Sequence, residues 1–168
     1  MSNSVKPFDE YPILGYKFDV VFIINGNNFN CAFQTISGLS KSTKTTKIHT
    51  GGDYFNEYLL PNTFSFKQVV FKRGVLRNFG DNRNPSFLQS WFENLGWING
   101  YKIETATVEI HVKDFDKNKK RVTVETFALS NAYPTTVTLG ELNSQKSEVL
   151  IETINLGFSS YSRINKNK

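Results

Sequence analysis

The feature that most constrains the fold is the alternation of apolar and polar residues in the segment 103–113, which is regular apart from a phase slip near Glu104-Thr105. Its apolar positions are Ile103, Ala106, Val108, Ile110 and Val112. Its polar positions include Thr107, Glu109, His111 and Lys113. Because successive side chains of a β-strand point to opposite faces, this pattern predicts a long strand with one buried face and one wet face.

Strand-like patterns fill most of the remaining chain. Strands are predicted for 16–24 and 29–35, joined around Asn25-Gly26, a dipeptide that suits the positive φ angles of a tight hairpin. Further strands are predicted for 63–72, 121–129, 131–139 and the C-terminal stretch 147–163. Long strands with short turns indicate a mainly β fold, a small antiparallel β-barrel or sandwich.

One short helix is predicted beside the strands, at about residues 85–95. Asn84 can cap its start, Pro85 fits its first turn, and Gly96 can take the left-handed conformation that ends it. Apolar residues recur at helical spacing and give one broad apolar face: Phe87, Leu88, Trp91, Phe92 and Leu95.

The segment 40–62 differs in kind from the predicted strands around it. It is rich in threonine and lysine and offers little apolar surface for a core, yet its end is too apolar for plain disorder. We interpret it as a protruding arm of a single domain that spans residues 1–168, with an N-terminal extension at 1–12 and a C-terminal tail at 164–168. Apolar candidates for contacts with another subunit lie within this arm: Tyr54, Phe55, Tyr58, Leu59 and Leu60.

Composition excludes several classes of protein. One cysteine, Cys31, rules out an internal disulfide framework, and no run approaches the roughly 18 apolar residues of a membrane helix. The N-terminus has no apolar signal-peptide core, so we expect assembly in the cytoplasm and no direct membrane insertion. The formal net charge of +5 suits solubility, an acidic partner protein or nucleic acid.

Motifs for catalysis, cofactor binding and metal binding are missing from the sequence. It has no phosphate-binding glycine loop, no nucleophile elbow and no zinc spacing. His49 and His111 lie in strand-like segments without a partner motif, and Cys31 is expected to be a buried, inert thiol. Lysines among aromatic residues could stack single-stranded nucleic acid, although core packing also explains those aromatics. We therefore expect no enzyme activity, no cofactor and no metal.

Several short stretches together resemble the tail-tube proteins of contractile injection systems, which include contractile phage tails, phage-tail-like particles and type VI-like secretion systems. The stretches occur in family order over roughly residues 12–163. They are "PILGYKFDV", "FQTISGL", "LLP", "FKRGV", "FLQSW", "NAYPTTV" and "SEVLIETINLGFSSYSR".

This resemblance implies a β-barrel-like subunit that forms hexameric rings stacked head to tail, with strands of all subunits joined into one barrel around a lumen. It implies an arm that reaches a neighbouring subunit or ring, and it makes Arg73 of "FKRGV" a candidate for a fork-like contact at a subunit boundary. The polar strand residues Thr107, Glu109, His111 and Lys113 would face the lumen or the exterior.

The resemblance also implies partners and a location. The partners are further copies of the chain, a sheath that contracts around the tube, baseplate or spike proteins, a tube terminator, and effector cargo in the lumen. The particle would assemble in the bacterial cytoplasm and then act as an injection particle or a phage tail. The alternatives are a tube-initiating isoform at the baseplate and, in another class, a monomeric β-barrel that binds a small ligand or single-stranded nucleic acid.

Overall fold

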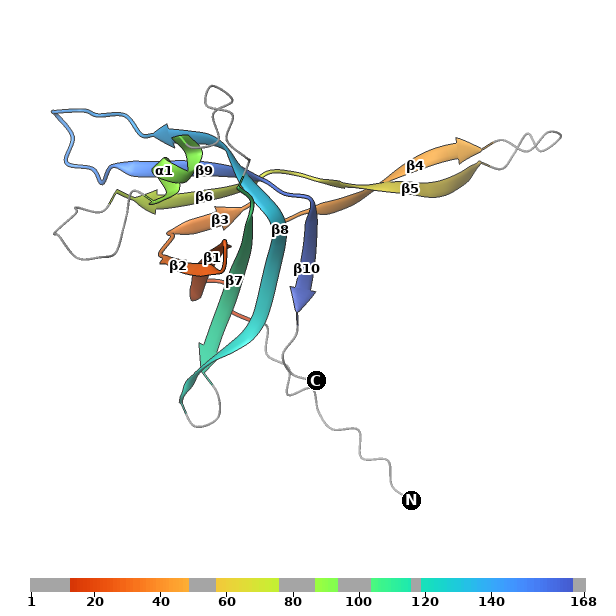
Figure 1. Ribbon diagram of the computed structural model, residues 1–168, viewed down its shortest axis with the longest axis horizontal. Coiled ribbons are helices and arrows are strands. Elements are labelled where there is room, and N and C mark those ends of the chain that lie inside the picture. Colours follow the sequence, from red (N-terminus) through yellow and green to blue (C-terminus); the bar gives the residue numbers. More distant parts are fainter. Residues whose placement is uncertain (1–12, 49–56, 76–86, 94–103, 116–118, 165–168) are drawn as a thin grey trace, which may run out of the picture.

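A computed structural model describes residues 13–48, 57–75, 87–93, 104–115 and 119–164, and within these ranges the chain is mainly β (Figure 1). The single helix there is α1 (Phe87–Glu93). The strands are β1 (Phe18–Ile24), β2 (Asn27–Cys31), β3 (Thr35–Ser37), β4 (Lys41–Ile48), β5 (Tyr58–Phe66), β6 (Val69–Gly74), β7 (Ala106–Phe115), β8 (Arg121–Leu139), β9 (Ile151–Gly157) and β10 (Ser160–Ile164).

Strand β8 joins two antiparallel sheets. Its first part pairs with β7 on one edge and β10 on the other, which gives the order β2-β1-β7-β8-β10. Its second part pairs with β9, which gives the order β8-β9-β6-β3. Strand β8 runs through both sheets (Figure 1), and buried residues from both sheets form one hydrophobic core.

The stretches 121–129 and 131–139, predicted as successive strands, form the single strand β8 of 19 residues. Asn131 lies within it at a φ of +51°, and the register with β7 shifts between Ala106 and Val108 at the same place. Asparagine tolerates the left-handed region better than most residues, and an extra residue bends a strand. The predicted break between two strands is therefore a bend within one strand.

Three other predicted strands differ from the structure. The stretch 63–72 is divided, because β5 ends at Phe66 and β6 begins at Val69. The stretch 29–35 is also divided, because β2 ends at Cys31 and a separate strand begins at Thr35. The C-terminal stretch forms β9 and β10, which pair in succession along one edge of β8. In each case the break follows from the backbone pairing, which the run of strand-forming residues did not reveal.

The hairpin predicted at Asn25-Gly26 is confirmed. Both residues have positive φ angles, +50° and +81°, and the strand pairs close immediately on either side of them. Positive φ angles at both central residues give a turn whose twist matches that of the flanking strands. The turn therefore sets the register that places Val20, Phe22 and Ile24 together on the core face of β1.

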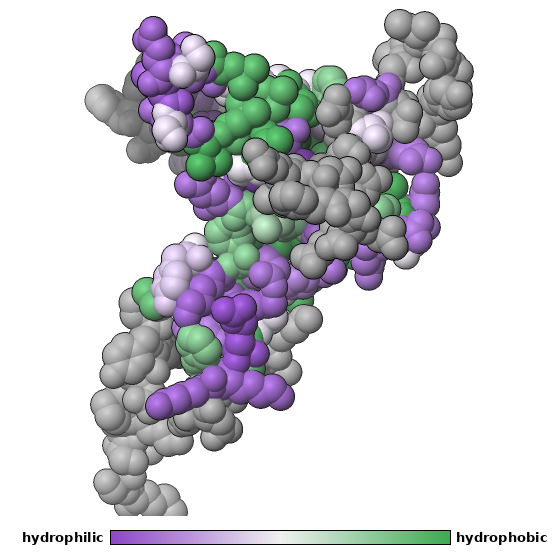
Figure 2. Space-filling view, turned by 90° about the vertical axis from the view of Figure 1, so that its left-hand side faces the viewer, coloured by the Kyte–Doolittle hydropathy of each residue, from purple (hydrophilic) through white to green (hydrophobic). Residues whose placement is uncertain are grey.

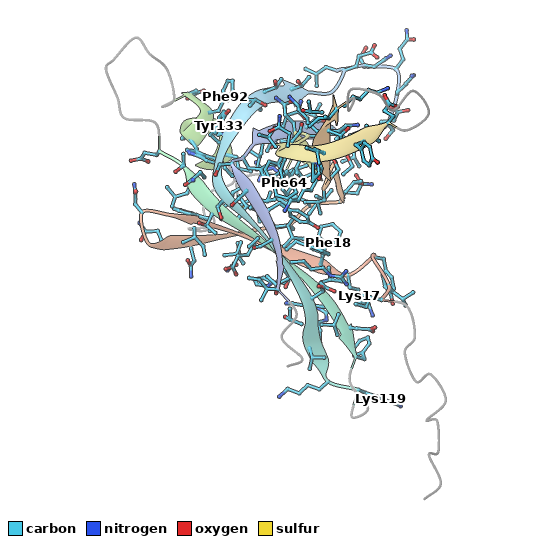
Figure 3. All side chains as sticks on the ribbon, turned by 90° about the vertical axis from the view of Figure 1, so that its right-hand side faces the viewer. Lys17, Phe18, Phe64, Phe92, Lys119 and Tyr133 are labelled. Atoms are coloured by element: carbon cyan, nitrogen blue, oxygen red, sulfur yellow. The ribbon has the colours of Figure 1, made fainter. Side chains whose placement is uncertain are left out.

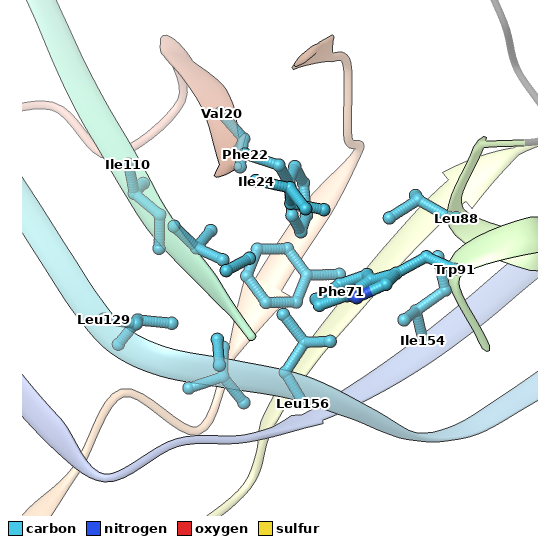
Figure 4. Packing of buried hydrophobic residues seen from close by; sticks show 14 residues of the cluster. Val20, Phe22, Ile24, Phe71, Leu88, Trp91, Ile110, Leu129, Ile154 and Leu156 are labelled. Carbon is cyan, nitrogen blue, oxygen red and sulfur yellow. The ribbon is translucent and has the colours of Figure 1, made fainter. Parts of the chain in front are cut away.

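The core is aromatic at its centre (Figure 4). The fully buried ring of Phe22 lies 6.1 Å from the ring of Phe33, 6.1 Å from that of Phe71 and 6.0 Å from that of Trp91. Trp91 brings α1 into this core, and its Nε1 donates a hydrogen bond to the backbone oxygen of Glu104 at 2.9 Å. The described helix covers the middle of the predicted range 85–95, whose ends lie outside the described residues.

Candidate assembly surfaces

Strands β4 and β5 form a two-stranded ribbon that projects from the body of the molecule (Figure 1). We call this ribbon the arm; it comprises the described residues 41–48 and 57–66. Every residue of β4 is exposed, and so are the first seven residues of β5. The arm extends four residues beyond the predicted segment 40–62, because β5 continues to Phe66. The strand predicted to begin at Thr63 therefore starts within the arm.

Large apolar side chains are exposed along the arm although it adds none to the core. Their exposed fractions lie between 41% and 60% for Ile48, Tyr58, Leu59, Leu60 and Phe64. Monomeric soluble proteins rarely leave such side chains together in water, and an unpartnered apolar surface marks an interaction site. Tyr54 and Phe55, the other two predicted contact residues, lie outside the described residues.

Register divides the arm into two faces. Ile48 lies opposite Tyr58, and Thr46 lies opposite Leu60, so these pairs share one face. Lys47 lies opposite Leu59 on the other face, where its Nζ is 2.6 Å from Glu57 Oε1. One face is therefore mainly apolar, and the other carries a solvent-exposed ion pair.

A close approach between two backbones positions the base of the arm. Gly38 connects β3 to β4 with a φ of +89°, and a Cβ atom added there would lie 2.4 Å from the backbone oxygen of Gln68. Gln68 connects β5 to β6, so both strands of the arm leave the second sheet at the same point. Glycine permits this crossing because it lacks the Cβ atom. Figure 3 looks toward the arm and labels Phe64 on it.

Arg73 is buried rather than exposed at the end of its strand. Only 8% of its surface is exposed, and its Nε donates to Glu152 Oε2 at 2.6 Å, from β6 to the neighbouring strand β9. The guanidinium carbon also lies 6.0 Å from the centre of the Phe33 ring. The Arg73 side chain therefore does not extend into water. The contact predicted for Arg73 was with a carboxylate or backbone carbonyls at a subunit boundary. The carboxylate that it contacts here belongs to the same chain, and a contact at a subunit boundary stays a prediction.

The polar face of β7 forms a network with its neighbouring strands. His111 Nε2 lies 3.2 Å from Glu109 Oε2, and His111 Nδ1 lies 3.1 Å from the hydroxyl of Thr126 on β8. Lys113 Nζ contacts the carboxylate of Asp19 on β1. All four predicted residues of this face, Thr107 included, are half-buried.

Another ion pair, which the sequence did not suggest, links β8 to β10. Arg163 donates from Nη2 to Glu125 Oε2 at 2.6 Å, and its Nε contacts the other carboxylate oxygen. The Glu125 carboxylate is almost fully buried, whereas the Arg163 side chain is 63% exposed. The hydrogen bond from Arg163 lowers the pKa of Glu125 below its usual range. The two residues are 38 positions apart, so no local pattern could have paired them.

Among the described residues, no group of three or more histidine, cysteine or acidic side chains is placed to hold a metal ion. Cys31 is half-buried rather than buried, and burial raises the pKa of its thiol. The described part of the chain contains no helix that is both long and apolar enough to cross a membrane.

Several strand edges have no partner strand within the described ranges. They include the outer edges of β2, β3 and β10, and the edge of β8 that lies opposite β9. Exposed edges favour pairing with another chain, and monomeric proteins usually protect them. Open strand edges and an exposed apolar arm are typical of β-rich subunits that cover these surfaces by assembling with other chains.

The chain belongs to a family of tail tube proteins. The family model described as "T4-like virus tail tube protein gp19" matches residues 14–162, which is most of the sequence. The family predicted from the short sequence stretches is therefore confirmed, and the chain is a structural tube protein. No curated protein matches the chain by sequence.

Solved structures of similar fold include three chains from contractile particles. The first, from the anti-feeding prophage baseplate, is 25% identical with a TM-score of 0.77 over 95% of this chain and 99% of that one. The second, from the PVC sheath-tube complex of an extracellular contractile injection system, is 20% identical with a TM-score of 0.74, covering 94% of each chain. The third, from the anti-feeding prophage cap, is 17% identical with a TM-score of 0.75 over 98% and 99%.

Proposed function

We propose that the chain is a subunit of the inner tube of a contractile injection system and works through assembly and rigidity rather than catalysis. The observation that carries this proposal is the match of the tail tube family model over residues 14–162. Copies of the chain would form hexameric rings that stack into a tube with a lumen for cargo. Contraction of a surrounding sheath would supply the mechanical energy, so an active site is not required.

The strand order of the second sheet supports a ring. Rotation about a ring axis preserves strand direction, and the path β8-β9-β6-β3 contains four strands in which each is antiparallel to the next. Strand β3 therefore runs opposite to β8, so β3 of one copy could pair antiparallel with the open edge of β8 in the next copy. The first sheet, β2-β1-β7-β8-β10, has five strands, so its outer strands β2 and β10 run in the same direction. If copies joined through this sheet, β2 of one copy would pair parallel with β10 of the next. The second sheet is thus the better candidate for a continuous barrel.

The arm is our candidate for contact with a neighbouring subunit or ring, through Tyr58, Leu59 and Leu60 and the adjacent residues Tyr54 and Phe55. Arg73 would act at a subunit boundary indirectly, by holding β6 against β9 beside the end of the second sheet. The polar face of β7 would line a wet surface of the particle.

The partners that we propose are the sheath, baseplate or spike proteins and a tube terminator. The chains of similar fold come from a baseplate, a sheath-tube complex and a cap, which supports this set. The particle would assemble in the bacterial cytoplasm and then act at a target envelope. A second candidate function is tube initiation at the baseplate, which is favoured by the 25% identity to a chain of the anti-feeding prophage baseplate.

Electron microscopy of the purified chain tests the proposed function. Negative-stain images of protein concentrated above about 1 mg/ml should show hexameric rings or stacked tubes, since heterologous contacts that do not close along an axis build filaments. Analytical ultracentrifugation at the same concentrations should show species of six subunits or more. A monodisperse monomer under all these conditions would contradict the proposal.

Deletion of residues 43–58 tests the role of the arm. The core residues lie outside the deleted segment, so the body should stay folded and keep a β-type circular dichroism spectrum, with only the signal of the arm strands lost. Rings or soluble subunits should persist while long tubes are lost. Tubes of normal length from the shortened chain would show that the arm is not an assembly element.

A further inference from the structure

We propose that the arm of one copy docks on an apolar, acidic patch at the opposite end of a second copy of this chain. We call this surface the end patch; it comprises Val75, Leu139, Leu142 and Val149 and the acidic residues Glu141 and Glu148. The inference rests on the proposed function, because it assumes that copies of the chain assemble, and it names the surface that receives the arm.

Three segments of chain that are distant in sequence build the end patch. Val75 follows β6, and its N–H donates to the backbone oxygen of Leu150 at 2.9 Å. Leu139 ends β8, and the next residue, Gly140, donates to the oxygen of Ile151 at 2.7 Å. These bonds hold the ends of β6, β8 and β9 side by side, so Val75 and Leu139 flank the same strand.

The connection between β8 and β9 adds the two most exposed apolar residues of the patch. Leu142 is 82% exposed and Val149 is 73% exposed. The connection has a turn of its own, in which the Asn143 side chain accepts a hydrogen bond from the N–H of Gln145 at 3.0 Å. In Figure 2, which views this end of the molecule, apolar residues gather near the top of the face beside hydrophilic ones. The patch is therefore presented outward and is not part of the core.

The position of the end patch indicates that a second copy of the chain binds there. The connection between β8 and β9 lies at one end of the molecule, and the arm extends from the other end (Figure 1). An arm on one side and an acceptor on the other form a heterologous pair, which repeats from copy to copy and builds a ring or a filament. Repetition of this contact would cover both exposed apolar surfaces in every copy.

The chemistry of the two surfaces is complementary. The described arm carries three lysines, Lys41, Lys44 and Lys47, against one acidic residue, Glu57. The connection after β8 carries two glutamates, Glu141 and Glu148, against one lysine, Lys146. Two of the arm lysines are engaged, Lys41 over the Phe64 ring and Lys47 with Glu57, which leaves Lys44 available. Apolar contact would provide the affinity, and the opposite charges would favour one orientation.

Disulfide trapping tests the contact directly. In a Cys31→Ser background, the variants Leu60→Cys and Leu142→Cys are purified separately, mixed under assembly conditions and oxidised. The mixture should form a cross-linked dimer that neither variant forms alone, and a chain carrying both substitutions should form a ladder of oligomers. The matched control pairs Leu60→Cys with Ser162→Cys, an exposed position on β10 away from the patch, and should not cross-link.

A second experiment measures assembly without cross-linking. Burial of two apolar side chains is lost in Leu142→Ser/Val149→Ser, so the concentration needed for assembly should rise about tenfold or more. Phe115→Ser is the control, because Phe115 is equally apolar and 50% exposed but lies on β7 outside the patch. Reversal of charge by Lys44→Glu should weaken assembly, and adding Glu141→Lys and Glu148→Lys should restore part of it.

The outcomes separate this inference from the proposed function. Tubes that assemble normally from the patch variant and show no cross-link between arm and patch would overturn the inference and leave the proposed function standing. Normal tubes that lose only their binding of sheath or terminator protein would assign the patch to that partner and also overturn the inference. A wild-type chain that never assembles would overturn both.

Discussion

Replacing Gly38 by alanine should destabilise the fold more than replacing Gly26 or Gly15 by alanine. Gly38 has a φ of +89°, and its added Cβ atom would lie 2.4 Å from the backbone oxygen of Gln68. A side chain in the left-handed region costs about 1–2 kcal/mol. Separating the two backbones adds on the order of 1–3 kcal/mol, as overpacking does in cores. The expected loss in the free energy of unfolding is therefore roughly 2–5 kcal/mol.

Two other glycines separate these contributions. Gly26 has a similar φ of +81° but no atom within 4 Å of its added Cβ, so Gly26→Ala should cost only about 1–2 kcal/mol. Gly15 has neither a positive φ nor a neighbour within 4 Å, so Gly15→Ala should change stability by less than about 0.5 kcal/mol. The difference between Gly38→Ala and Gly26→Ala isolates the close approach to Gln68.

Urea unfolding at concentrations below the assembly threshold measures the three free energies, and thermal unfolding gives a second readout. For a chain of this size, each kcal/mol lowers the midpoint by about 2–4 °C, so Gly38→Ala should lower it by roughly 4–20 °C. Equal losses for Gly38→Ala and Gly26→Ala, within about 0.5 kcal/mol, would refute the argument that the close approach requires glycine.

Three further predictions concern other buried contacts. Glu152→Gln should cost about 3–5 kcal/mol, because it leaves the buried Arg73 charge without its carboxylate, and Arg73→Met with Glu152→Leu should recover much of that loss. Because Arg163 lowers the pKa of Glu125 in the folded state, the stability advantage of wild type over Arg163→Leu should be complete at neutral pH. That advantage should shrink as the pH falls below the usual glutamate range toward the folded-state pKa. Trp91→Ala should cost about 3–5 kcal/mol in urea unfolding, because it empties the site beside Phe22.

Each of these predictions has a contradicting result. Equal stability of the single and double Arg73 and Glu152 variants would mean that the buried charge is not the cause of the loss. A stability difference between wild type and Arg163→Leu that stays constant from pH 7 to pH 3 would exclude Glu125 as the titrating group. A loss below about 1 kcal/mol for Trp91→Ala would show that α1 contributes little to the core.

The sequence specified the strands well because their signal is local. Alternation in 103–113 identified the core face of β7, and Asn25-Gly26 identified a hairpin, since both depend only on neighbouring residues. The apolar residues Tyr58, Leu59 and Leu60 were assigned to the exposed arm for the same reason, because the segment around them offers no core face.

The limits of the strands and the pairing between strands were harder to predict from the sequence. The sequence suggested a break at Asn131, where the strand only bends, and no break at the crossing of Gly38 with Gln68, so the predicted limits of β5, β6 and β8 were wrong. Those limits follow from which strands pair, and pairing joins segments that are far apart in the chain. Arg73 was expected to make a fork-like contact, but its partner Glu152 lies 79 positions away and could not be named from the sequence.

The sequence by itself determined a β-rich chain, the hairpin, the helix that carries Trp91 and the family to which the chain belongs. Only the tertiary structure decided that one strand joins both sheets, that Arg73 is buried, and that the arm and the end patch lie at opposite ends. The physical reason is the distance along the chain over which each interaction acts. Side-chain periodicity and turn preference act within a few residues, whereas a surface is made by segments that meet only after the sheets have formed.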